Sequence, residues 1–323
     1  AGRILVPLNA SLTLEAPLVV KFDLGRIDDG DANPYNPPAG RIFVEGRLHA
    51  YGGPEKGVVF TSIRDCSVGG DATPSNPDDN TPAKDDWFGI ELWGSEEKVL
   101  SNCRLGYAHH GIHLMGANSG VSSCEVHDCW NGIAANCASI AGEATIVDNK
   151  VWGCSFNENG LEYGAGIWLY QEGNITVANN ECFGNHAGIH VQDGFQAVTG
   201  NDLHHNTFGI YAAGLRQNAL ISLNRFYGNS YVNLDIINSD CLVERNEIGL
   251  AGYDKSQYGL YLHQDDGKEH APQLTKNVIQ NHETGIYICS NMQPSVYANL
   301  VRRNTHGVVT DNSAREVALF VQI

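Results

Sequence analysis

The sequence predicts an all-β solenoid, a fold in which one short unit is stacked on itself. A phrase of the type Gly-Ile-x-Leu returns about every 22 residues, and a fixed period in this range is typical of stacked repeats. Asn recurs a fixed distance before most of these phrases. Glycine is abundant, at 36 residues, while helix-forming runs are scarce, as in chains of short strands joined by turns. The phrases begin at Gly89, Gly111, Gly132, Gly166, Gly188, Gly209, Gly259, Gly285 and Gly307.

Each repeat is expected to form one rung of about 22 residues, with three short strands and three turns. Neighbouring rungs should lie about 4.8 Å apart, as paired strands do, and about 10 to 12 rungs would use the whole chain. Two series of Asn mark two of the turns, where stacked side chains can satisfy backbone groups of the rungs above and below. The first series is Asn149, Asn180, Asn201, Asn224, Asn246, Asn277 and Asn299, and the second is Asn185, Asn206, Asn229 and Asn304.

An asparagine ladder of this kind resembles the right-handed parallel β-helix family, the fold of pectate lyases and of many secreted bacterial repeat proteins. The opening segments, such as Leu12-Thr13-Leu14, resemble the first rungs of that family. The repeat motif encodes stacking and not chemistry, so the resemblance implies a fold and no particular activity. It implies one solenoid domain over 1–323, with opening rungs in 1–64 that carry a loop at 28–39, an Asp-, Pro- and Gly-rich insertion at 65–86, and regular rungs in 87–323.

The charge of the chain excludes several classes of partner. There are 37 acidic and 20 basic residues, which gives a net charge of −17. Nucleic acids and anionic lipid surfaces are bound through clustered Lys and Arg, so neither is expected as a partner. No apolar stretch approaches the roughly 18 residues of a membrane span. An acidic surface together with the β-helix resemblance favours an extracellular or cell-surface protein.

Four of the nine cysteines align with the asparagine ladders. Cys103 and Cys124 take the first steps of the first ladder, and Cys129 and Cys154 take the first steps of the second. A buried Cys behaves as a small hydrophobic residue, so stacked, unbonded thiols are expected inside the solenoid. A disulfide between adjacent rungs is the alternative, because the Cα spacing permits one. No C-x-x-C or paired His/Cys spacing indicates a structural zinc site.

The variable position of the Gly-Ile-x-Leu phrase should face outward. Ile and Leu alternate inward along a strand, so x points to solvent, as does the residue two positions later. These two columns are rich in Tyr, Trp and His, and rings spaced by one rung suit the apolar faces of successive sugars. In the family that the chain resembles, the strand at this position forms the substrate groove. We therefore predict a substrate-binding face of Glu91, His113, Trp168, Tyr170, Gln192, Tyr261, His263 and Tyr287.

The densest group of reactive side chains on this face is His190, Tyr211 and Asp235 on successive rungs, with Asp193 beside them. A His with a carboxylate and a Tyr can move protons on a sugar, and Asp193 with Asp235 could act as the carboxylate pair of a hydrolase. Lyases and epimerases of uronic acids also need a cation for the sugar carboxylate, and the outward columns contain no Arg or Lys. The competing interpretation is that Tyr and Trp are simply good strand formers.

Acidic residues follow three of the Gly-Ile strands at one turn. Carboxylates on neighbouring rungs could hold Ca²⁺ through oxygen ligands. Asp and Gly are also ordinary turn formers, which is the alternative at each position. The candidate ligands are Glu172, Asp193, Asp265 and Asp266.

Insertions and histidine pairs give further expectations. The insertions at 155–165, 251–258 and 264–272 interrupt the period, and loops that interrupt a rigid solenoid often carry function. Two adjacent pairs, His109–His110 and His204–His205, should point to opposite sides of their strands and form no shared metal site.

The predicted function is recognition of a polysaccharide or surface glycan along the Gly-Ile face. Whether the protein is an enzyme stays open at this point, and the candidate activities are polysaccharide lyase, epimerase and glycoside hydrolase. The rival hypothesis is a structural subunit of an extracellular fibre, surface layer or adhesin. A parallel solenoid leaves unpaired strand edges at its ends, and neither end shows an amphipathic helix that would cover them. Copies of the chain could therefore assemble end to end. The sugar and its linkage are not encoded in these patterns.

Overall fold

A computed structural model of the chain divides it into two compact units, Ala1–Trp168 and Leu169–Ile323, and each unit is described by itself. No helix of the described part is long and apolar enough to cross a membrane. The predicted loop at 28–39 and the candidate ligand Glu172 lie outside the described residues. Those residues are 2–23, 40–53, 57–72, 81–116, 118–136, 138, 143–171, 174–194, 196–250, 252, 256–289, 292–311 and 319–322.

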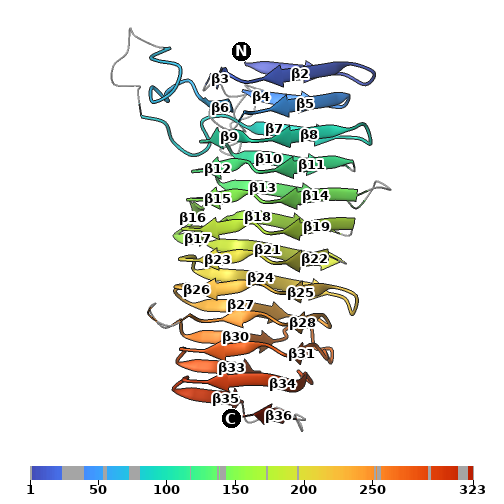
Figure 1. Ribbon diagram of the computed structural model, residues 1–323, viewed down its shortest axis with the longest axis vertical. Coiled ribbons are helices and arrows are strands. Elements are labelled where there is room, and N and C mark those ends of the chain that lie inside the picture. The colour runs from blue at the N-terminus through green and yellow to red at the C-terminus, as the bar shows by residue number, and fades with distance from the viewer. Residues whose placement is uncertain are drawn as a thin grey trace. The chain divides into compact units, whose positions relative to one another are not determined.

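In each unit the Gly-Ile phrases lie side by side in a parallel sheet, which we call the Gly-Ile sheet (Figure 1). In the first unit its strands are β1 (Arg3–Val6), β4 (Arg41–Val44), β7 (Gly89–Trp93), β10 (His110–Met115), β13 (Asn131–Asn136) and most of β18 (Ala165–Tyr170), whose last two residues belong to the second unit. Ile90, Ile112 and Ile133 are register partners on three of these strands, and all three are fully buried. The isoleucines of successive phrases therefore form a column of buried side chains inside the solenoid.

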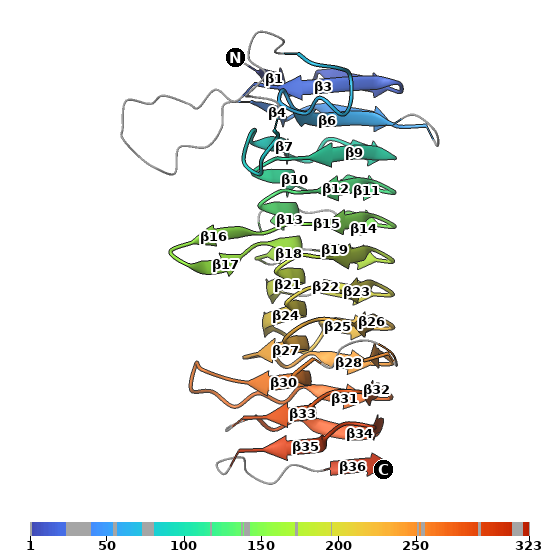
Figure 2. The ribbon, with the colours of Figure 1, turned by 90° about the vertical axis from the view of Figure 1, so that its left-hand side faces the viewer.

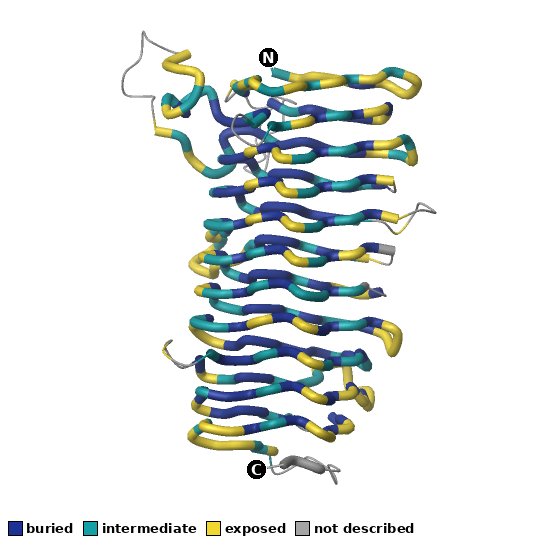
Figure 3. Tube along the Cα trace, viewed as in Figure 1, coloured by how far each residue is buried: buried dark blue, intermediate teal, exposed yellow. Residues whose placement is uncertain are grey.

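The second unit repeats this arrangement. Its Gly-Ile strands are β21 (Ala187–Gly194), β24 (Phe208–Leu215), β27 (Val232–Ile237), β30 (Tyr258–His263), β33 (Thr284–Ile288) and β35 (His306–Thr310). Ile210, Leu234 and Leu260 are register partners, and each is fully buried. Buried and more exposed positions alternate along the rungs in Figure 3. Burial of one such side chain contributes about 1.5–3 kcal/mol, so the repeated column is a large part of the stability of each unit.

Two further strands complete each rung, as predicted. In the first unit they are β2 (Ser11–Glu15), β3 (Leu18–Phe22), β5 (Arg47–Tyr51), β6 (Val58–Ser62), β8 (Lys98–Ser101), β9 (Cys103–Gly106), β11 (Ser119–Ser122), β12 (Glu125–His127), β14 (Glu143–Val147) and β15 (Lys150–Trp152). In the second they are β19 (Asn174–Ala178), β20 (Glu181–Phe183), β22 (Gln196–Thr199), β23 (Asp202–His204), β25 (Leu220–Ser222), β26 (Arg225–Tyr227), β28 (Leu242–Glu244), β29 (Glu247–Ile248), β31 (Gln273–Thr275), β32 (Val278–Gln280), β34 (Ser295–Arg302) and β36 (Leu319–Gln322). β34 pairs with both β31 and β32, so in that rung the two strands are continuous.

One insertion forms regular structure of its own. The predicted insertion at 155–165 contains an antiparallel hairpin of β16 (Phe156–Glu158) and β17 (Leu161–Tyr163). The hairpin extends away from the rungs (Figure 2), and the β17 residues are exposed. It belongs to the first unit and brings Phe156 to the strands beside it.

Both asparagine ladders are confirmed. Asn201 Oδ1 accepts hydrogen bonds from the backbone N–H of Asn180 at 2.9 Å and from its side-chain nitrogen at 3.0 Å. Asn201 Nδ2 in turn donates to the Val177 carbonyl at 3.2 Å. The same pattern continues from Asn224 to Asn299, and the second ladder joins Asn185, Asn206 and Asn229. The amides satisfy backbone groups that a tight bend would leave unpaired.

The cysteines follow the ladder prediction. The eight that the structure describes are thiols and not disulfides, and six of these are buried. Asn149 Oδ1 accepts from the backbone N–H of Cys124 at 3.0 Å, so Cys124 occupies the ladder step below Asn149. The prediction of an all-β, right-handed parallel β-helix with Asn and Cys ladders is therefore confirmed. The prediction of one domain over the whole chain stays a prediction, because each unit is a compact body.

Candidate functional site

The predicted outward column of the second unit is in register. His190 pairs with Tyr211, Tyr211 with Asp235, Asp235 with Tyr261, and Tyr261 with Tyr287 on the strands β21, β24, β27, β30 and β33. The stacking of Ile and Leu inside fixes this order, because a shift of one residue would turn the whole outward set into the core. The sequence therefore predicted correctly which of these side chains are neighbours.

His190 is not a strong acid–base group in this setting. Its ring meets the Tyr211 ring edge to face at 4.8 Å. Burial, helped by the nearby His186, lowers the pKa of His190 to about 4, so the imidazole is uncharged at neutral pH. Burial raises the pKa of Tyr211, with smaller contributions from Asp235 and Asp265. Both side chains are therefore suited to hydrogen bonding and ring contact rather than to proton transfer.

The carboxylate of this group is paired with His263, a histidine outside the predicted catalytic group. His263 Nε2 lies 3.0 Å from Asp235 Oδ1, and the Asp235 side chain is only 6% exposed. Burial raises the pKa of Asp235, and the hydrogen bond and charge of His263 oppose that shift. His263 was predicted to bind substrate, and the structure makes it the partner of the buried acid, two positions along the strand from Tyr261.

The Tyr261 ring lies 4.8 Å from the His263 ring and belongs to a group of four tyrosines, Tyr231, Tyr258, Tyr261 and Tyr287, which we call the tyrosine cluster. Tyr261 and Tyr287 are stacked with ring centroids 5.3 Å apart. Tyr258 contacts both of them at 4.9 and 5.5 Å, and Tyr231 contacts Tyr258 at 5.9 Å. The sequence interpretation omitted Tyr231 and Tyr258. Tyr258 stands directly before the glycine of its phrase, and Phe208 holds the same position in another phrase. This position forms a third column of rings, from which Tyr258 could have been predicted.

The remaining predicted substrate residues are dispersed. Gln192 lies at the exposed end of β21, and Tyr170 lies half-buried at the start of the second unit. Glu91 and His113 are register partners in the first unit. Burial, helped by His109, lowers the pKa of His113 to about 4.

The expectation that the Gly-Ile face contains no basic residue is wrong in the first unit. Arg41 Nη1 lies 3.0 Å from Glu91 Oε2, and the Arg41 guanidinium lies 4.7 Å from the centre of the Phe88 ring. Arg41 was missed because β4 carries no Gly-Ile phrase, although it pairs with β7. The carboxylate of Glu91 is therefore neutralised by its neighbour, which reduces its availability to a ligand.

The candidate calcium ligands contact residues of their own turn or of a neighbouring rung. Asp265 exchanges two hydrogen bonds with Asn238, at 2.6 and 2.9 Å. A hydrogen bond from the Lys268 backbone lowers the pKa of Asp266 to about 2. Asp193 adopts a left-handed backbone with φ of 58°, and its carboxylate lies over Gly214 of the next rung, where a side chain would collide with it. No group of three potential ligands gathers among the described residues. Calcium binding stays a prediction.

The histidine pairs are closer than expected. The rings of His109 and His110 are 4.6 Å apart, and the Nδ1 atoms of His204 and His205 are 2.7 Å apart. The expectation that they point to opposite sides is wrong. His205 has φ of 55°, because it lies at a bend beyond the end of β23, where strand alternation no longer applies.

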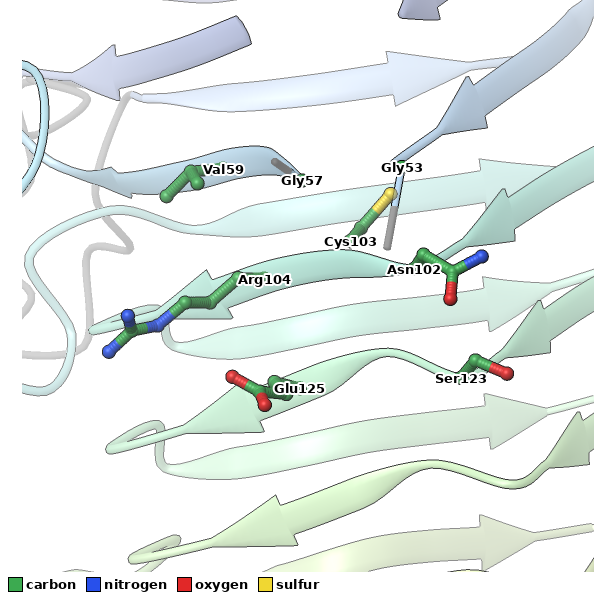
Figure 4. A pocket seen from close by; sticks show the side chains of 8 residues that line it. All are labelled: Gly53, Gly57, Val59, Asn102, Cys103, Arg104, Ser123 and Glu125. Atoms are coloured by element: carbon green, nitrogen blue, oxygen red, sulfur yellow. The ribbon is translucent and has the colours of Figure 1, made fainter. Parts of the chain in front are cut away.

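Two cavities of the first unit are lined by described residues. One, of about 360 Å³, is lined by Arg104 and Glu125 on neighbouring strands, with Asn102, Ser123 and the Cys103 thiol (Figure 4). Its lining carries charges of both signs, and Arg104 Nε also donates to His127 Nε2 at 3.3 Å. The other cavity, the aromatic pocket, has a volume of about 400 Å³. It is lined by His109, His110, Trp130, Asn131, Phe156, Asn157, Glu158 and Trp168. Of these, only Trp168 had been predicted as a binding residue.

A protein-family comparison identifies the chain. The family described as "Periplasmic copper-binding protein (NosD)" matches residues 44–239 and 157–318, which together cover more than half of the sequence. The chain belongs to the NosD family. No curated protein matches this NosD-family chain.

Solved structures similar to this NosD-family chain are parallel β-helix proteins. The Dettilon tailspike protein aligns with a TM-score of 0.60 and 14% identity, over 96% of this chain and 61% of the tailspike. The NosD-family chain therefore spans less than two thirds of the length of that protein. DFA-IIIase from Arthrobacter chlorophenolicus A6, in complex with GF2, aligns with a TM-score of 0.43 and 15% identity, over 91% of this chain and 74% of the enzyme. PfbA, a surface adhesin of Streptococcus pneumoniae, aligns with a TM-score of 0.34 and 10% identity, over 89% and 81%. At such identities the likeness shows the fold alone.

Proposed function

We propose that this chain binds a polysaccharide along the outward face of the Gly-Ile sheet, and that the tyrosine cluster is the principal contact surface. The observation that carries the proposal is the set of four neighbouring tyrosine rings on and beside register-paired strands. Aromatic faces bury the apolar side of a sugar ring, while the phenol hydroxyls remain able to hydrogen-bond. Tyr231 is 39% exposed, and the other three are half-buried, so the surface is open to a ligand.

The Asp235–His263 pair supplies the polar contact at the same place. A carboxylate hydrogen-bonded to an imidazole presents a fixed donor or acceptor to a sugar hydroxyl. Any turnover of a bound polysaccharide is expected to depend on this pair more than on His190. His263→Gln should then abolish release of reducing or unsaturated ends, whereas His190→Ala should reduce it less. Equal losses in the two variants would contradict this assignment.

The test of binding is affinity electrophoresis of the full chain through gels that contain neutral, acidic or amino-sugar polysaccharides. We expect at least one polymer to retard the chain. Tyr261→Ala and Tyr287→Ala should each raise the dissociation constant obtained from retardation roughly tenfold, because loss of a stacked ring costs about 1–3 kcal/mol of binding free energy.

The matched control is Tyr297→Ala. Tyr297 is an exposed tyrosine of the same unit, but it lies on β34, away from the Gly-Ile sheet. Its loss should leave retardation unchanged. The proposal fails if no polymer retards the chain, or if all three variants behave alike.

Copper, which the family description names, finds no suitable set of ligands among the described residues. Protein copper sites typically combine three or four His, Cys or Met donors, and no group of three His, Cys, Asp or Glu side chains gathers in the described part. Burial, with the neighbouring Cys154, raises the pKa of Cys129, which keeps that thiol protonated, although a metal needs the thiolate. His204 and His205 bring two ring nitrogens together, but His204 Nε2 faces Glu181 at 3.2 Å. We derive no copper chemistry from this arrangement.

The location that we propose is outside the cytoplasm, either extracellular or periplasmic. The description of the family as periplasmic supports it, and so does the proposed ligand, since long polysaccharides occur chiefly outside the cell membrane.

A further inference from the structure

The aromatic pocket of the first unit is built by an insertion. Trp130 precedes β13 and Trp168 lies on β18, while Phe156 comes from the hairpin. The Trp130 and Phe156 rings are stacked at 5.0 Å, so the hairpin is held against the rungs by a ring contact. The pocket exists only because the chain leaves the solenoid at residue 155 and returns at residue 164.

One wall of the pocket is part of a continuous row of rings. His109 lies 4.3 Å from Trp130 and 5.5 Å from Phe88. On the other side of Trp130, Phe156 lies 5.6 Å from Tyr163. His109, Trp130 and Phe156 each contact two other rings of this row, so the wall offers a preformed apolar surface to a ligand.

The polar side chains of the pocket are fixed in orientation. His109 Nδ1 lies 2.7 Å from Asp85 Oδ1, which leaves the other ring nitrogen, Nε2, for a ligand. Asn131 Oδ1 accepts from the Ala165 backbone at 3.0 Å, and its Nδ2 lies 3.4 Å from His110 Nδ1. Burial, with smaller contributions from His109 and His113, lowers the pKa of His110 well below its usual range. His110 therefore brings no positive charge to the pocket.

The charge and size of the pocket restrict its ligand. Glu158 is the acidic group of its lining, and the lining contains no Lys or Arg, so phosphate and carboxylate ligands are disfavoured. A volume of about 400 Å³ is at the lower end of the roughly 300–1,000 Å³ of small-molecule pockets. A flat ring with one apolar face and a rim of hydroxyls matches aromatic walls and a few fixed polar groups.

We propose that the aromatic pocket binds a single neutral pyranose ring, with the sugar face against the Trp168 indole and its hydroxyls directed to Glu158 and His109. This site goes beyond the polysaccharide face proposed above, because it is a separate pocket in the other unit and takes one ring. The two proposals can therefore fail separately.

The test is saturation-transfer NMR of the full chain with the methyl glycosides of glucose, galactose, mannose and N-acetylglucosamine, followed by titration of tryptophan fluorescence. We expect saturation transfer to at least one glycoside. Trp168→Ala should weaken its binding at least tenfold, and Glu158→Gln should weaken it several-fold. Glu158→Gln retains the size of the side chain and changes only its charge and acceptors, so it guards against a trivial loss of folding.

The matched control is Trp93→Ala. Trp93 is a 37% exposed tryptophan of the same unit, and it contacts Phe43 at 5.8 Å, outside the pocket. Its loss should leave glycoside binding intact, as should Tyr261→Ala in the other unit. The proposal is overturned if no glycoside receives saturation, or if Trp168→Ala binds as the parent does. Displacement of the bound glycoside by tetramethylammonium at lower concentration than by free sugar would also overturn it, in favour of a cation-binding cage.

Discussion

Asn224 shows at the scale of one residue why the ladder requires this amino acid. Its Oδ1 accepts from the backbone and side-chain nitrogens of Asn201, at 2.9 and 3.0 Å, while its Nδ2 donates to the Val198 carbonyl at 3.0 Å. Asp has the same shape but no donor, and it would carry a charge into a position that is fully buried. Only an uncharged side chain of this length, with an acceptor and a donor at its tip, satisfies both neighbours.

His282 replaces asparagine at one step of the second ladder. Its backbone N–H donates to Asn304 Oδ1 at 3.0 Å, as a ladder Asn would. Its ring lies between the Ser256 hydroxyl, 3.0 Å from Nδ1, and the Ile248 carbonyl, 3.2 Å from Nε2. A carbonyl only accepts, so Nε2 carries the proton and Nδ1 accepts from Ser256. Burial lowers the pKa of His282 to about 4, and the Ile248 carbonyl opposes that shift.

We predict that His282 makes the protein less stable in mild acid. The pKa of His282 is lower in the folded chain than the usual 6.5, so the unfolded chain binds the extra proton first. The contribution of His282 is complete above about pH 6.5 and is lost as the pH falls towards 4, by on the order of 3 kcal/mol. His282→Asn should restore a ladder amide and flatten the dependence of unfolding free energy on pH in that window, measured by urea denaturation.

His306→Asn is the control for this prediction, because His306 is exposed on β35. It should leave the pH dependence of the parent unchanged. His113 and His190, with pKa values of about 4, act in the same direction, so some dependence should survive in His282→Asn. An unchanged slope in His282→Asn would show that this imidazole is not the group responsible.

At the scale of elements, the hairpin of β16 and β17 is an addition to the solenoid scaffold that forms part of the aromatic pocket. Its strands pair with each other, and β17 is exposed along its length. The rungs on either side are held by the ladders and by the buried Ile and Leu columns. The contributions of the hairpin to stability and to ligand binding can therefore be measured separately.

We predict that replacing residues 156–163 by a short Gly-Ser linker will leave the solenoid folded. The unfolding free energy should fall by only about 1 kcal/mol, because the main loss is the ring contact between Phe156 and Trp130. Glycoside binding at the aromatic pocket should disappear, while retardation by polysaccharide should persist. Urea denaturation measures the first effect, and the two binding assays measure the others. Loss of cooperative unfolding would show instead that the hairpin is part of the scaffold.

At the scale of the whole molecule, net charge bears on the rival hypothesis of a structural fibre. A charge of −17 on 35.0 kDa repels copies of the chain from one another. The proposed function needs no assembly, whereas a fibre or surface layer does.

We predict a single species of about 35.0 kDa by multi-angle light scattering at 0.15 M salt, where the Debye length is about 8 Å. Raising the salt to 1 M screens the repulsion and is the control for charge. Long assemblies that persist at both salt concentrations would favour the structural alternative over polysaccharide binding.

The sequence by itself determined the fold and the vertical order of the outward side chains. Period and ladder position are local properties of the chain, and burial of Ile and Leu leaves a rung only one register. The series from His190 to Tyr287 could therefore be predicted residue by residue. Contacts that depend on turns and insertions could not, because no period governs them.

Only the tertiary structure decided which side chains meet across that order. It paired Asp235 with His263, which lies two positions along the neighbouring strand from Tyr261, the register partner of Asp235, and a column does not encode such a diagonal contact. It placed Arg41 beside Glu91 although β4 lacks the repeat phrase. It also closed the aromatic pocket with Phe156 from an insertion. The repeat determines how the rungs stack, whereas side-chain orientation and the insertions into the repeat determine where a ligand could bind.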